Sequence, residues 1–247
     1  MERKFFLKSL LAGAVTAPAL LAACSKDEVT PTSSSSGTTT TGGTTTTGGT
    51  SSAGSCTEAP TETEGPFPTH TPASYVRSDI TDGRTGYKLT VNITVTNSKS
   101  SCAAVAGALV DIWHCDKEGN YSEYGGTSMQ STNYTSVHFL RGRQTTDSSG
   151  LVTFTSIFPG WYQSRATHIH VHIYSASGTS LKVTQIAFSE GTGSALLAVN
   201  GYSKGMTGYT YNASDNVFSD GYTLELATVT GNTTDGFVLN ITLAVAA

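Results

Sequence analysis

Three histidines alternate with apolar residues in the segment His168–Ile173. Successive side chains of an extended strand point to opposite faces, so the three imidazoles would share one face of it. Two neutral imidazoles that stand two residues apart, such as His168 and His170, can reach the same metal ion. The pattern alone does not choose the metal, because zinc and copper sites use it too. A polar strand face with ordinary hydrogen-bonded histidines explains it equally well.

The neighbouring residues favour ferric iron. Tyr162 stands six residues before His168, and Arg165 lies between them. A phenolate is a hard, anionic ligand that stabilises Fe(III) over Fe(II). No glutamate follows within 173–176, as a cupin-type site would require. His172 is on the correct face, but it would lie roughly 7 Å further along the strand than His170.

The elements that must position these residues are predicted to be strands. Period-2 alternation and β-branched residues dominate from Tyr87 onward, and no long helical stripe occurs. With Gly-rich turns between the strands, the pattern predicts an all-β, two-sheet β-sandwich with long loops and a single catalytic domain. Gly107 is expected to mark a bulge. Strands are expected at 87–95, 105–113, 151–157, 167–174, 181–188, 223–229 and 237–245, with one short helix at 194–200.

Several ordered motifs together resemble the intradiol ring-cleavage dioxygenases, the family of protocatechuate 3,4-dioxygenase and catechol 1,2-dioxygenase, and in particular its exported single-domain members. The similarity covers nearly all of residues 56–247. The motifs are Thr63–Phe67, Val110–Asp116 with Gly119–Ser122, Arg141–Phe154, Pro159–Tyr162 with Arg165 and His168–His170, Thr184–Ile186, and Asp215–Asp220. The chain has Ala166-Thr167 where the family often has Pro-Ala, and Phe67-Pro68 where it often has tyrosine after Gly-Pro; neither change removes a ligand.

The resemblance implies a role for each candidate residue. Tyr121, Tyr162, His168 and His170 would hold one Fe(III), and Tyr162 would leave it when substrate arrives. Arg165 would stabilise negative charge on the bound ring, and Gln185 would orient the substrate. The implied reaction opens catechol-type rings between the two hydroxyls to give cis,cis-muconate-type diacids, with both atoms of O2 incorporated. Catechol, protocatechuate, hydroxyquinol and larger plant phenols all stay open as substrates.

Two other functions are compatible with parts of the sequence. The segments Gly107–Asp111 and Gly119–Tyr121 also resemble transthyretin-like and adhesin-type sandwiches, which would make the chain a non-catalytic binding module on the cell surface. Such a module has no use for a Tyr, Arg and two His together. A zinc or copper site on the histidine face is the third possibility, and it would not need Tyr162.

The first quarter of the chain carries targeting signals. Residues 1–23 are expected to be a lipoprotein signal peptide, because a basic start is followed by an apolar run too short to span a bilayer. Cys24 would be lipidated and would hold the protein to a bacterial membrane, with periplasmic and surface exposure both open. Residues 24–55, rich in Ser, Thr and Gly, would form a tether, which leaves 56–247 as the dioxygenase-like domain.

Charge and cysteine usage fit an exported protein. The net charge of −4 provides no basic surface for nucleic acid. Of the remaining cysteines, Cys102 and Cys115 would stand near opposite ends of one strand, too far apart for a disulfide. Cys56 and Cys102 are therefore the preferred pair, which leaves Cys115 as a buried thiol. The sequence does not determine the oligomeric state.

Overall fold

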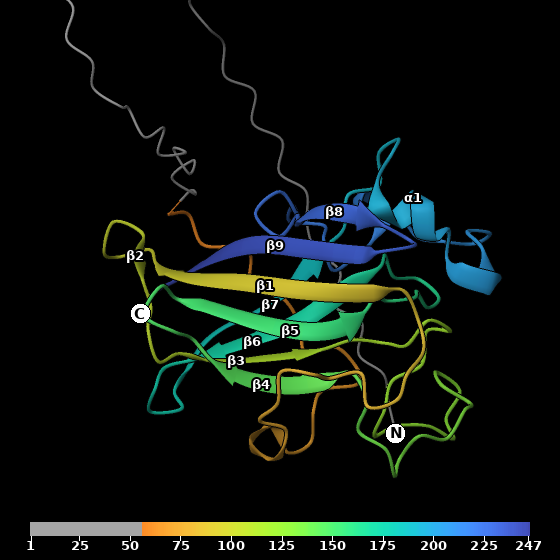
Figure 1. Cartoon of the computed structure of the whole chain (residues 1–247), viewed down its shortest axis with the longest axis horizontal. Coiled ribbons are helices and arrows are strands. Elements are labelled where there is room, and N and C mark those ends of the chain that lie inside the picture. The colour runs from red at the N-terminus through yellow and green to blue at the C-terminus, as the bar shows by residue number, and fades with distance from the viewer. Residues whose placement is uncertain (1–55) are drawn as a thin grey trace, which may run out of the picture. The chain divides into compact units, whose positions relative to one another are not determined.

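Two β-sheets pack face to face in the computed structural model, which describes residues 56–247 (Figure 1). This arrangement confirms the expected all-β, two-sheet sandwich. The expected signal peptide, Cys24 and the tether lie outside the described residues. Within the described residues, no helix is long and apolar enough to cross a membrane.

The first sheet is built around a central strand, β1 (Lys88–Asn97). On one side β1 runs parallel to β9 (Gly236–Val245), and β8 (Thr228–Asn232) pairs antiparallel with β9. On its other side β1 pairs antiparallel with β5 (Leu151–Ile157) and with the two-residue strand β2 (Ala103–Ala104). The alternation of Leu89, Val91, Ile93 and Val95 turns the apolar side of β1 into the interior.

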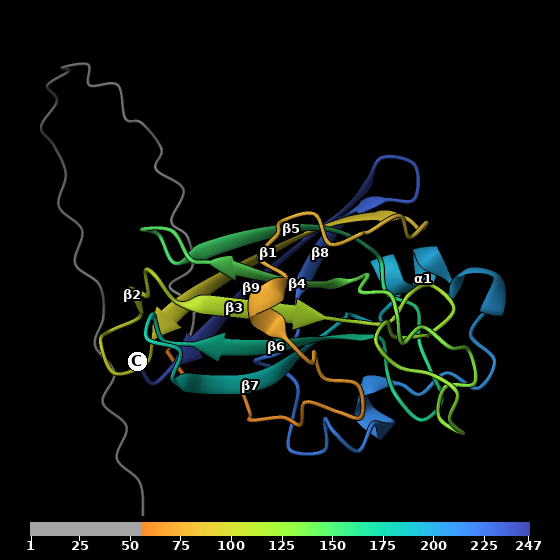
Figure 2. The ribbon, with the colours of Figure 1, turned by 90° about the horizontal axis from the view of Figure 1, so that it is seen from below.

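The second sheet has the order β4-β3-β6-β7, and all its pairs are antiparallel (Figure 2). Its strands are β3 (Leu109–Trp113), β4 (Arg141–Thr145), β6 (His168–Tyr174) and β7 (Ser180–Ala187). The apolar residues of β6, Ile169, Val171 and Ile173, join the main hydrophobic core. The histidines of β6 consequently point away from the sandwich interior.

Between residues 56 and 247, helices are few and short. α1 (Ala195–Val199) is the expected helix; the side chain of Ser194 accepts a hydrogen bond from Leu197 N at its start, and Asn200 ends it in the left-handed region. Three 3-10 turns lie at Pro72–Ser74, Tyr202–Lys204 and Asn212–Ser214.

The expectations about strands were confirmed only in part. Gly107 does mark a bulge: its N donates to the Thr146 carbonyl and Thr146 N donates to the Ala108 carbonyl, so two residues oppose one, and its φ is +78°. The strand expected at 105–113 begins only at Leu109. The strand expected at 223–229 lies instead at 228–232. β4 was missed because Arg141 and Arg143 interrupt any apolar alternation, and tertiary contacts compensate: Arg143 forms an ion pair with Asp111 on the neighbouring β3.

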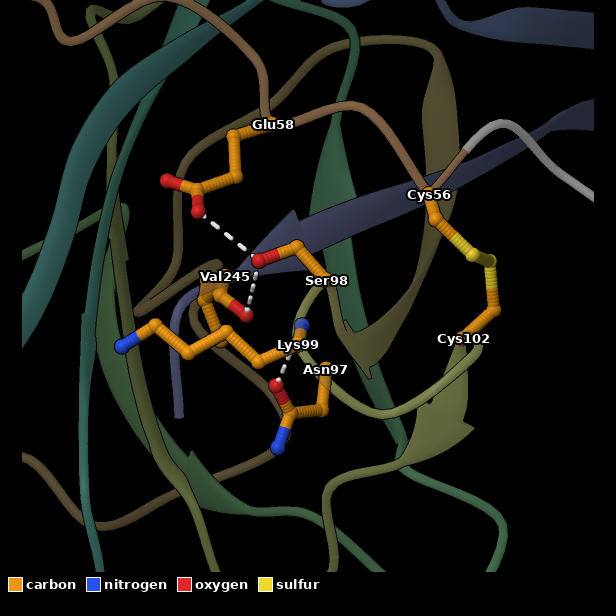
Figure 3. Close-up of a disulfide and its surroundings, with 7 residues drawn as sticks. All are labelled: Cys56, Glu58, Asn97, Ser98, Lys99, Cys102 and Val245. Atoms are coloured by element: carbon orange, nitrogen blue, oxygen red, sulfur yellow. Dashed lines mark hydrogen bonds between the residues drawn. A yellow bond between two sulfur atoms is a disulfide. The ribbon is translucent and has the colours of Figure 1, made fainter.

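A disulfide joins Cys56 to Cys102, the pair favoured on the sequence, with their Cα atoms 5.2 Å apart (Figure 3). It ties the first described residue to the loop after β1. Beside it, the Ser98 hydroxyl donates to Glu58 and to the carbonyl of Val245, which fixes the same segment to the end of β9 (Figure 3). Cys115 is a free, buried thiol, and burial raises its pKa.

Candidate metal centre

The register of the second sheet sets up the candidate centre. His170 on β6 lies directly opposite Trp113 on β3 and opposite Gln185 on β7. Residues that pair directly across antiparallel strands share one face of the sheet. That face is outside the sandwich core, yet all three side chains are buried, because the loops before β1 and between β3 and β4 cover them.

Four side chains meet above this face, and they are the four candidate ligands. The Tyr121 hydroxyl lies 3.3 Å from His168 Nε2 and 3.2 Å from His170 Nε2, and the two Nε2 atoms are 3.1 Å apart. The rings of Tyr121 and Tyr162 meet edge to face with centroids 5.6 Å apart, and the Tyr162 ring also packs against His168. Residues far apart in the sequence thus bring two phenols and two imidazoles to one point.

Burial controls the protonation of these four groups. It raises the pKa of Tyr121 well above its ordinary value, and it also raises the pKa of Tyr162. Burial lowers the pKa of His168 and of His170 well below the ordinary value, and the positive charge of Arg165 acts in the same direction. Both imidazoles are therefore neutral at physiological pH, with lone pairs available to a cation.

The orientation of each imidazole has its own cause. His168 Nδ1 lies 2.6 Å from the carbonyl of Ala166, which makes Nδ1 the donor and leaves a lone pair on Nε2. His170 Nδ1 has no hydrogen-bond partner. Packing holds the His170 ring instead: Trp113 stacks on it with centroids 4.9 Å apart and planes 3° from parallel, and Gly65 lies close to its Cε1.

Gly65 is expected to be essential for the position of His170. A Cβ atom at Gly65 would stand 2.9 Å from His170 Cε1, and the φ of +70° already disfavours a side chain. We expect Gly65→Ala to weaken iron binding by roughly 10- to 100-fold, the range for residues that orient a metal ligand. Iron content after dialysis against a graded chelator measures this effect.

Gly83→Ala is the matched control for that variant. Gly83 has a similar φ of +78°, but nothing lies within 4 Å of the added Cβ. It should share the backbone strain of Gly65→Ala and keep the iron affinity of the wild type. Equal iron affinities for the two variants would contradict a role of Gly65 in holding His170.

Tyr121 is fixed by a loop that lies between β3 and β4. Its backbone N donates to Gln130 Oε1 over 2.6 Å, and Gln130 Nε2 donates back to the carbonyls of Tyr121, Tyr124 and Thr132. Phe67 stacks on the Tyr121 ring with centroids 4.7 Å apart. The buried amide of Gln130 thus substitutes for secondary structure in this loop.

Arg165 is held beside the four groups by a buried network. Its Nε donates to both carboxylate oxygens of Asp215, at 3.0 and 2.9 Å, and its Nη2 donates to Gln185 Oε1 over 2.5 Å. Its Nη1 lies 3.4 Å from the Tyr162 hydroxyl and 3.4 Å from His168 Nε2. A fixed positive charge therefore faces the point where the phenols and imidazoles meet.

A buried carboxyl group lies behind Gln185. Glu225 Oε1 accepts a hydrogen bond from the Thr184 hydroxyl over 2.5 Å and lies 3.4 Å from Gln185 N, while Oε2 has no partner. Burial raises the pKa of Glu225 to about 7, so this carboxyl group holds its proton through the acidic and into the neutral range.

The protonated Glu225 should make stability depend on pH. Because its folded pKa is raised above 4.5, its contribution is fully present below pH 4.5 and is lost as pH rises through about 7. We expect the free energy of unfolding of wild type, relative to Glu225→Gln, to fall by roughly 1 to 3 kcal/mol across this window. Urea unfolding at a series of pH values measures it. Glu118→Gln, at an exposed position, is the control, and parallel curves for wild type and Glu225→Gln would contradict the assignment.

Several other histidines and tyrosines near the centre in the sequence have partners elsewhere. Both ring nitrogens of His114 are engaged, by the Cys115 carbonyl and the Ser156 hydroxyl. The ring nitrogens of His172 contact Glu64 and Ser180. The hydroxyl of Tyr124 donates to the Pro68 carbonyl, and Tyr134 packs on Phe139. Among the described residues, no cluster of three His, Cys, Asp or Glu side chains could hold a metal ion.

The four converging groups fit an iron ion. Neutral imidazole and phenolate are established ligands of iron in proteins. Separations of 3.1 to 3.3 Å between donor atoms match adjacent ligands that each lie about 2.1 Å from a first-row metal ion. The residues present therefore fit the metal that the sequence implied.

Known proteins place the chain in a family. A sequence profile described as dioxygenase matches residues 63–200, more than half of the chain, and the matched segment contains every candidate ligand. An intradiol ring-cleavage dioxygenase from Tetranychus urticae shares 28% identity at a TM-score of 0.67, over 77% of this chain and 95% of that one. This chain belongs to the intradiol ring-cleavage dioxygenase family. Members of this family are oxidoreductases that act on catecholic substrates with O2 and are generally non-haem iron enzymes.

More distant structures share the fold. One is the dioxygenase domain of a dioxygenase carbohydrate-binding protein fusion from the cellulolytic bacterium Streptomyces sp. SirexAA-E, with 23% identity, a TM-score of 0.54, and coverage of 76% of this chain and 97% of that one. Another is 3-chlorocatechol 1,2-dioxygenase from Rhodococcus opacus 1CP, with 18% identity, a TM-score of 0.52, and coverage of 76% and 72%. A comparison with curated protein sequences gives no match.

Sequence reasoning gave no role to several residues that support this intradiol centre. Gly65 and Asp215 belong to the family motifs Thr63–Phe67 and Asp215–Asp220, but the sequence does not show that they contact His170 and Arg165. Gln130 lay outside every motif, and no local signal identifies it. Trp113 lies in the motif Val110–Asp116, but its stacking on the His170 ring is visible only in the structure.

Proposed function

We propose that this chain is a non-haem Fe(III) dioxygenase that opens catechol-type rings between their two hydroxyls. The products would be cis,cis-muconate-type diacids that contain both atoms of O2. The convergence of Tyr121, His168 and His170 within hydrogen-bonding distance of one another, with the Tyr162 ring packed against Tyr121 and His168, carries the proposal, together with the family membership. Bound Fe(III) would supply Lewis acidity and a site at which a catecholate can chelate.

The two tyrosines would have different roles. Tyr121 is completely buried and is fixed by Gln130 and Phe67, which suits a ligand that stays in place. Tyr162 lines a hollow at the surface, beside the guanidinium of Arg165. That position suits a ligand that gives way to substrate, and its freed phenolate oxygen would take up a proton from a catechol hydroxyl.

Arg165 and Gln185 would act on the substrate ring. The Arg165 charge is fixed by Asp215 and needs no rearrangement to face negative charge that develops on the ring. Gln185 fixes Nη2 of Arg165 and is itself held, because its Nε2 donates to the carbonyl of Thr63 over 2.9 Å. Both residues would therefore be preorganised before substrate binds.

Metal analysis and colour test the proposal directly. The purified full-length protein should contain one iron per chain and be red-brown, because phenolate-to-Fe(III) charge transfer absorbs visible light. A chelator should remove the colour together with catechol-dependent O2 uptake, and Fe(III) should restore both. Iron-loaded protein without colour would refute the two-tyrosinate centre, and the lack of O2 uptake with every catechol tried would refute the reaction.

The two alternatives predict different results in the same experiment. A transthyretin- or adhesin-like binding module should bind no stoichiometric metal, although it gives no reason for the four converging side chains. A zinc or copper site on the histidine face should be unaffected by Tyr162→Phe, whereas loss of a tyrosinate should shift the absorption of an iron centre.

The location of the enzyme is also a proposal. We propose export and lipid attachment at Cys24, which would make the lipid the only link to a membrane. Cys24→Ser should abolish labelling by a fatty-acid analogue in the native host and release the protein from the membrane fraction. Protease treatment of intact cells would then separate a periplasmic from a surface location.

A further inference from the structure

The hollow beside Tyr162 and Arg165 has a mainly apolar wall. Its volume is about 380 Å³, and its lining includes Pro66, Met129 and Val217 next to the two site residues. A catechol whose hydroxyls face Tyr162 would therefore turn its opposite ring carbons toward these apolar side chains. A substituent on those carbons would meet the wall first.

The charge of this hollow does not favour an acidic substituent. Arg165 is the one cation in its lining, and Asp215, Gln185 and Tyr162 already contact its Nε, Nη2 and Nη1. A carboxylate on the substrate ring would lose water without gaining a free cation, which is costly. The lining of this hollow therefore offers a carboxylated catechol no free cation.

A second hollow shares a wall with the first. It has a volume of about 510 Å³, shares Pro66 and Met129 with the first hollow, and adds the rings of Phe67 and Tyr124. Its charged group, Glu123, is paired with buried Arg141, and His138 and His70 also contact it. An apolar or aromatic group fits this lining, and a second anion would face the carboxylate of Glu123.

Met129 forms the boundary between the two hollows. Met129 is 64% exposed, while the neighbouring Gln130 anchors the loop backbone to Tyr121. Methionine is flexible and polarizable and suits contact with varied aromatic groups. The loop thus holds the flexible apolar side chain of Met129 near the candidate ligand Tyr121.

We infer that the preferred substrates are uncharged catechols with an extended apolar or aromatic substituent, which lies over Met129 from the first hollow into the second. This inference rests on the proposed ring-cleavage function. Together the two hollows have the size of sites for multi-ring ligands, which is more than a single catechol ring needs.

Substrate comparison tests the inference on the iron-loaded full-length protein. The probes are catechol, phenylcatechol and protocatechuate, and the measurement is kcat/KM from O2 uptake. We expect phenylcatechol to exceed protocatechuate by about tenfold or more, since burial of a phenyl ring is worth at least that factor. A kcat/KM for protocatechuate that equals or exceeds that for phenylcatechol would overturn the inference.

Substitution of Met129 tests the path of the substituent. Met129→Lys, which adds a cation at the boundary, should shift the ratio of kcat/KM toward protocatechuate by about tenfold, and Met129→Leu should keep the wild-type preference. Val238→Lys is the matched control, because Val238 is a surface residue of β9 on the other sheet. If Met129→Lys changes the ratio no more than Val238→Lys does, the path is wrong.

Anaerobic binding separates failure of this inference from failure of the proposed function. Quenching of tryptophan fluorescence should give tighter binding of phenylcatechol than of protocatechuate, and Met129→Lys should reduce this difference by about tenfold. If no catechol is cleaved but this binding order holds, the proposed ring-cleavage reaction is wrong, whereas the inferred binding of the substituent across the two hollows is right. If catechol is cleaved but the binding order is absent, only the inference about the substituent fails.

Discussion

Tyr121→Phe should remove the red-brown colour and lower ring cleavage by at least about 100-fold, beyond the loss expected for residues that only orient a ligand. The reason is that the Tyr121 oxygen lies within 3.3 Å of Nε2 of both His168 and His170, so its loss removes one candidate ligand atom. The phenyl ring can keep its stacking on Phe67, so the fold should survive. Visible absorption, iron content and O2 uptake on the same sample measure the effect.

Tyr134→Phe is the matched control, because it makes the same chemical change in the same loop at a tyrosine that packs on Phe139. It should keep iron, colour and activity. The iron content of Tyr162→Phe should lie between those of Tyr121→Phe and Tyr134→Phe, and its colour should differ from that of the wild type. Full iron content and wild-type colour in Tyr121→Phe would exclude this tyrosine as a ligand.

Asp215→Ala should lower the free energy of unfolding by roughly 3 to 5 kcal/mol, the cost of leaving a buried charge without its partner. Asp215 accepts from Arg165 Nε with both oxygens and also from the backbone N of Ala166 and of Val217. The variant should also lose most of its ring cleavage, because Arg165 is no longer fixed beside Tyr162. Urea unfolding and kcat/KM measure the two effects separately.

A double variant separates the structural from the catalytic contribution of this pair. Asp215→Ala with Arg165→Met removes both charges, so part of the lost stability should return while activity stays low. Asp235→Ala, in the exposed turn before β9, is the control and should change stability by about 0.5 kcal/mol or less. Recovery of activity in the double variant would show that the Arg165 charge is not needed.

The local pattern of the sequence was enough for most of the fold. Alternation of apolar and polar residues is a property of neighbouring positions, and it predicted β5 and β6 almost residue by residue. It failed where long-range contacts override local preference. β4 contains Arg141 and Arg143, whose buried hydrogen bonds and ion pairs come from other parts of the chain. The segment at 223–227 alternates but makes only an isolated bridge between Leu226 and Ala187.

The sequence by itself determined the candidate ligands, since two histidines two residues apart must share a strand face and a motif set marked the tyrosines. Only the tertiary structure decided what holds them. Gly65 meets His170 from a loop more than 100 residues earlier, and Asp215 reaches Arg165 across 50 residues. The tertiary structure also formed the two adjoining hollows, because Pro66 and Met129 come to line them together only when two loops pack against each other. Side-chain periodicity is local, whereas the path of a loop depends on packing with segments that are remote in the sequence.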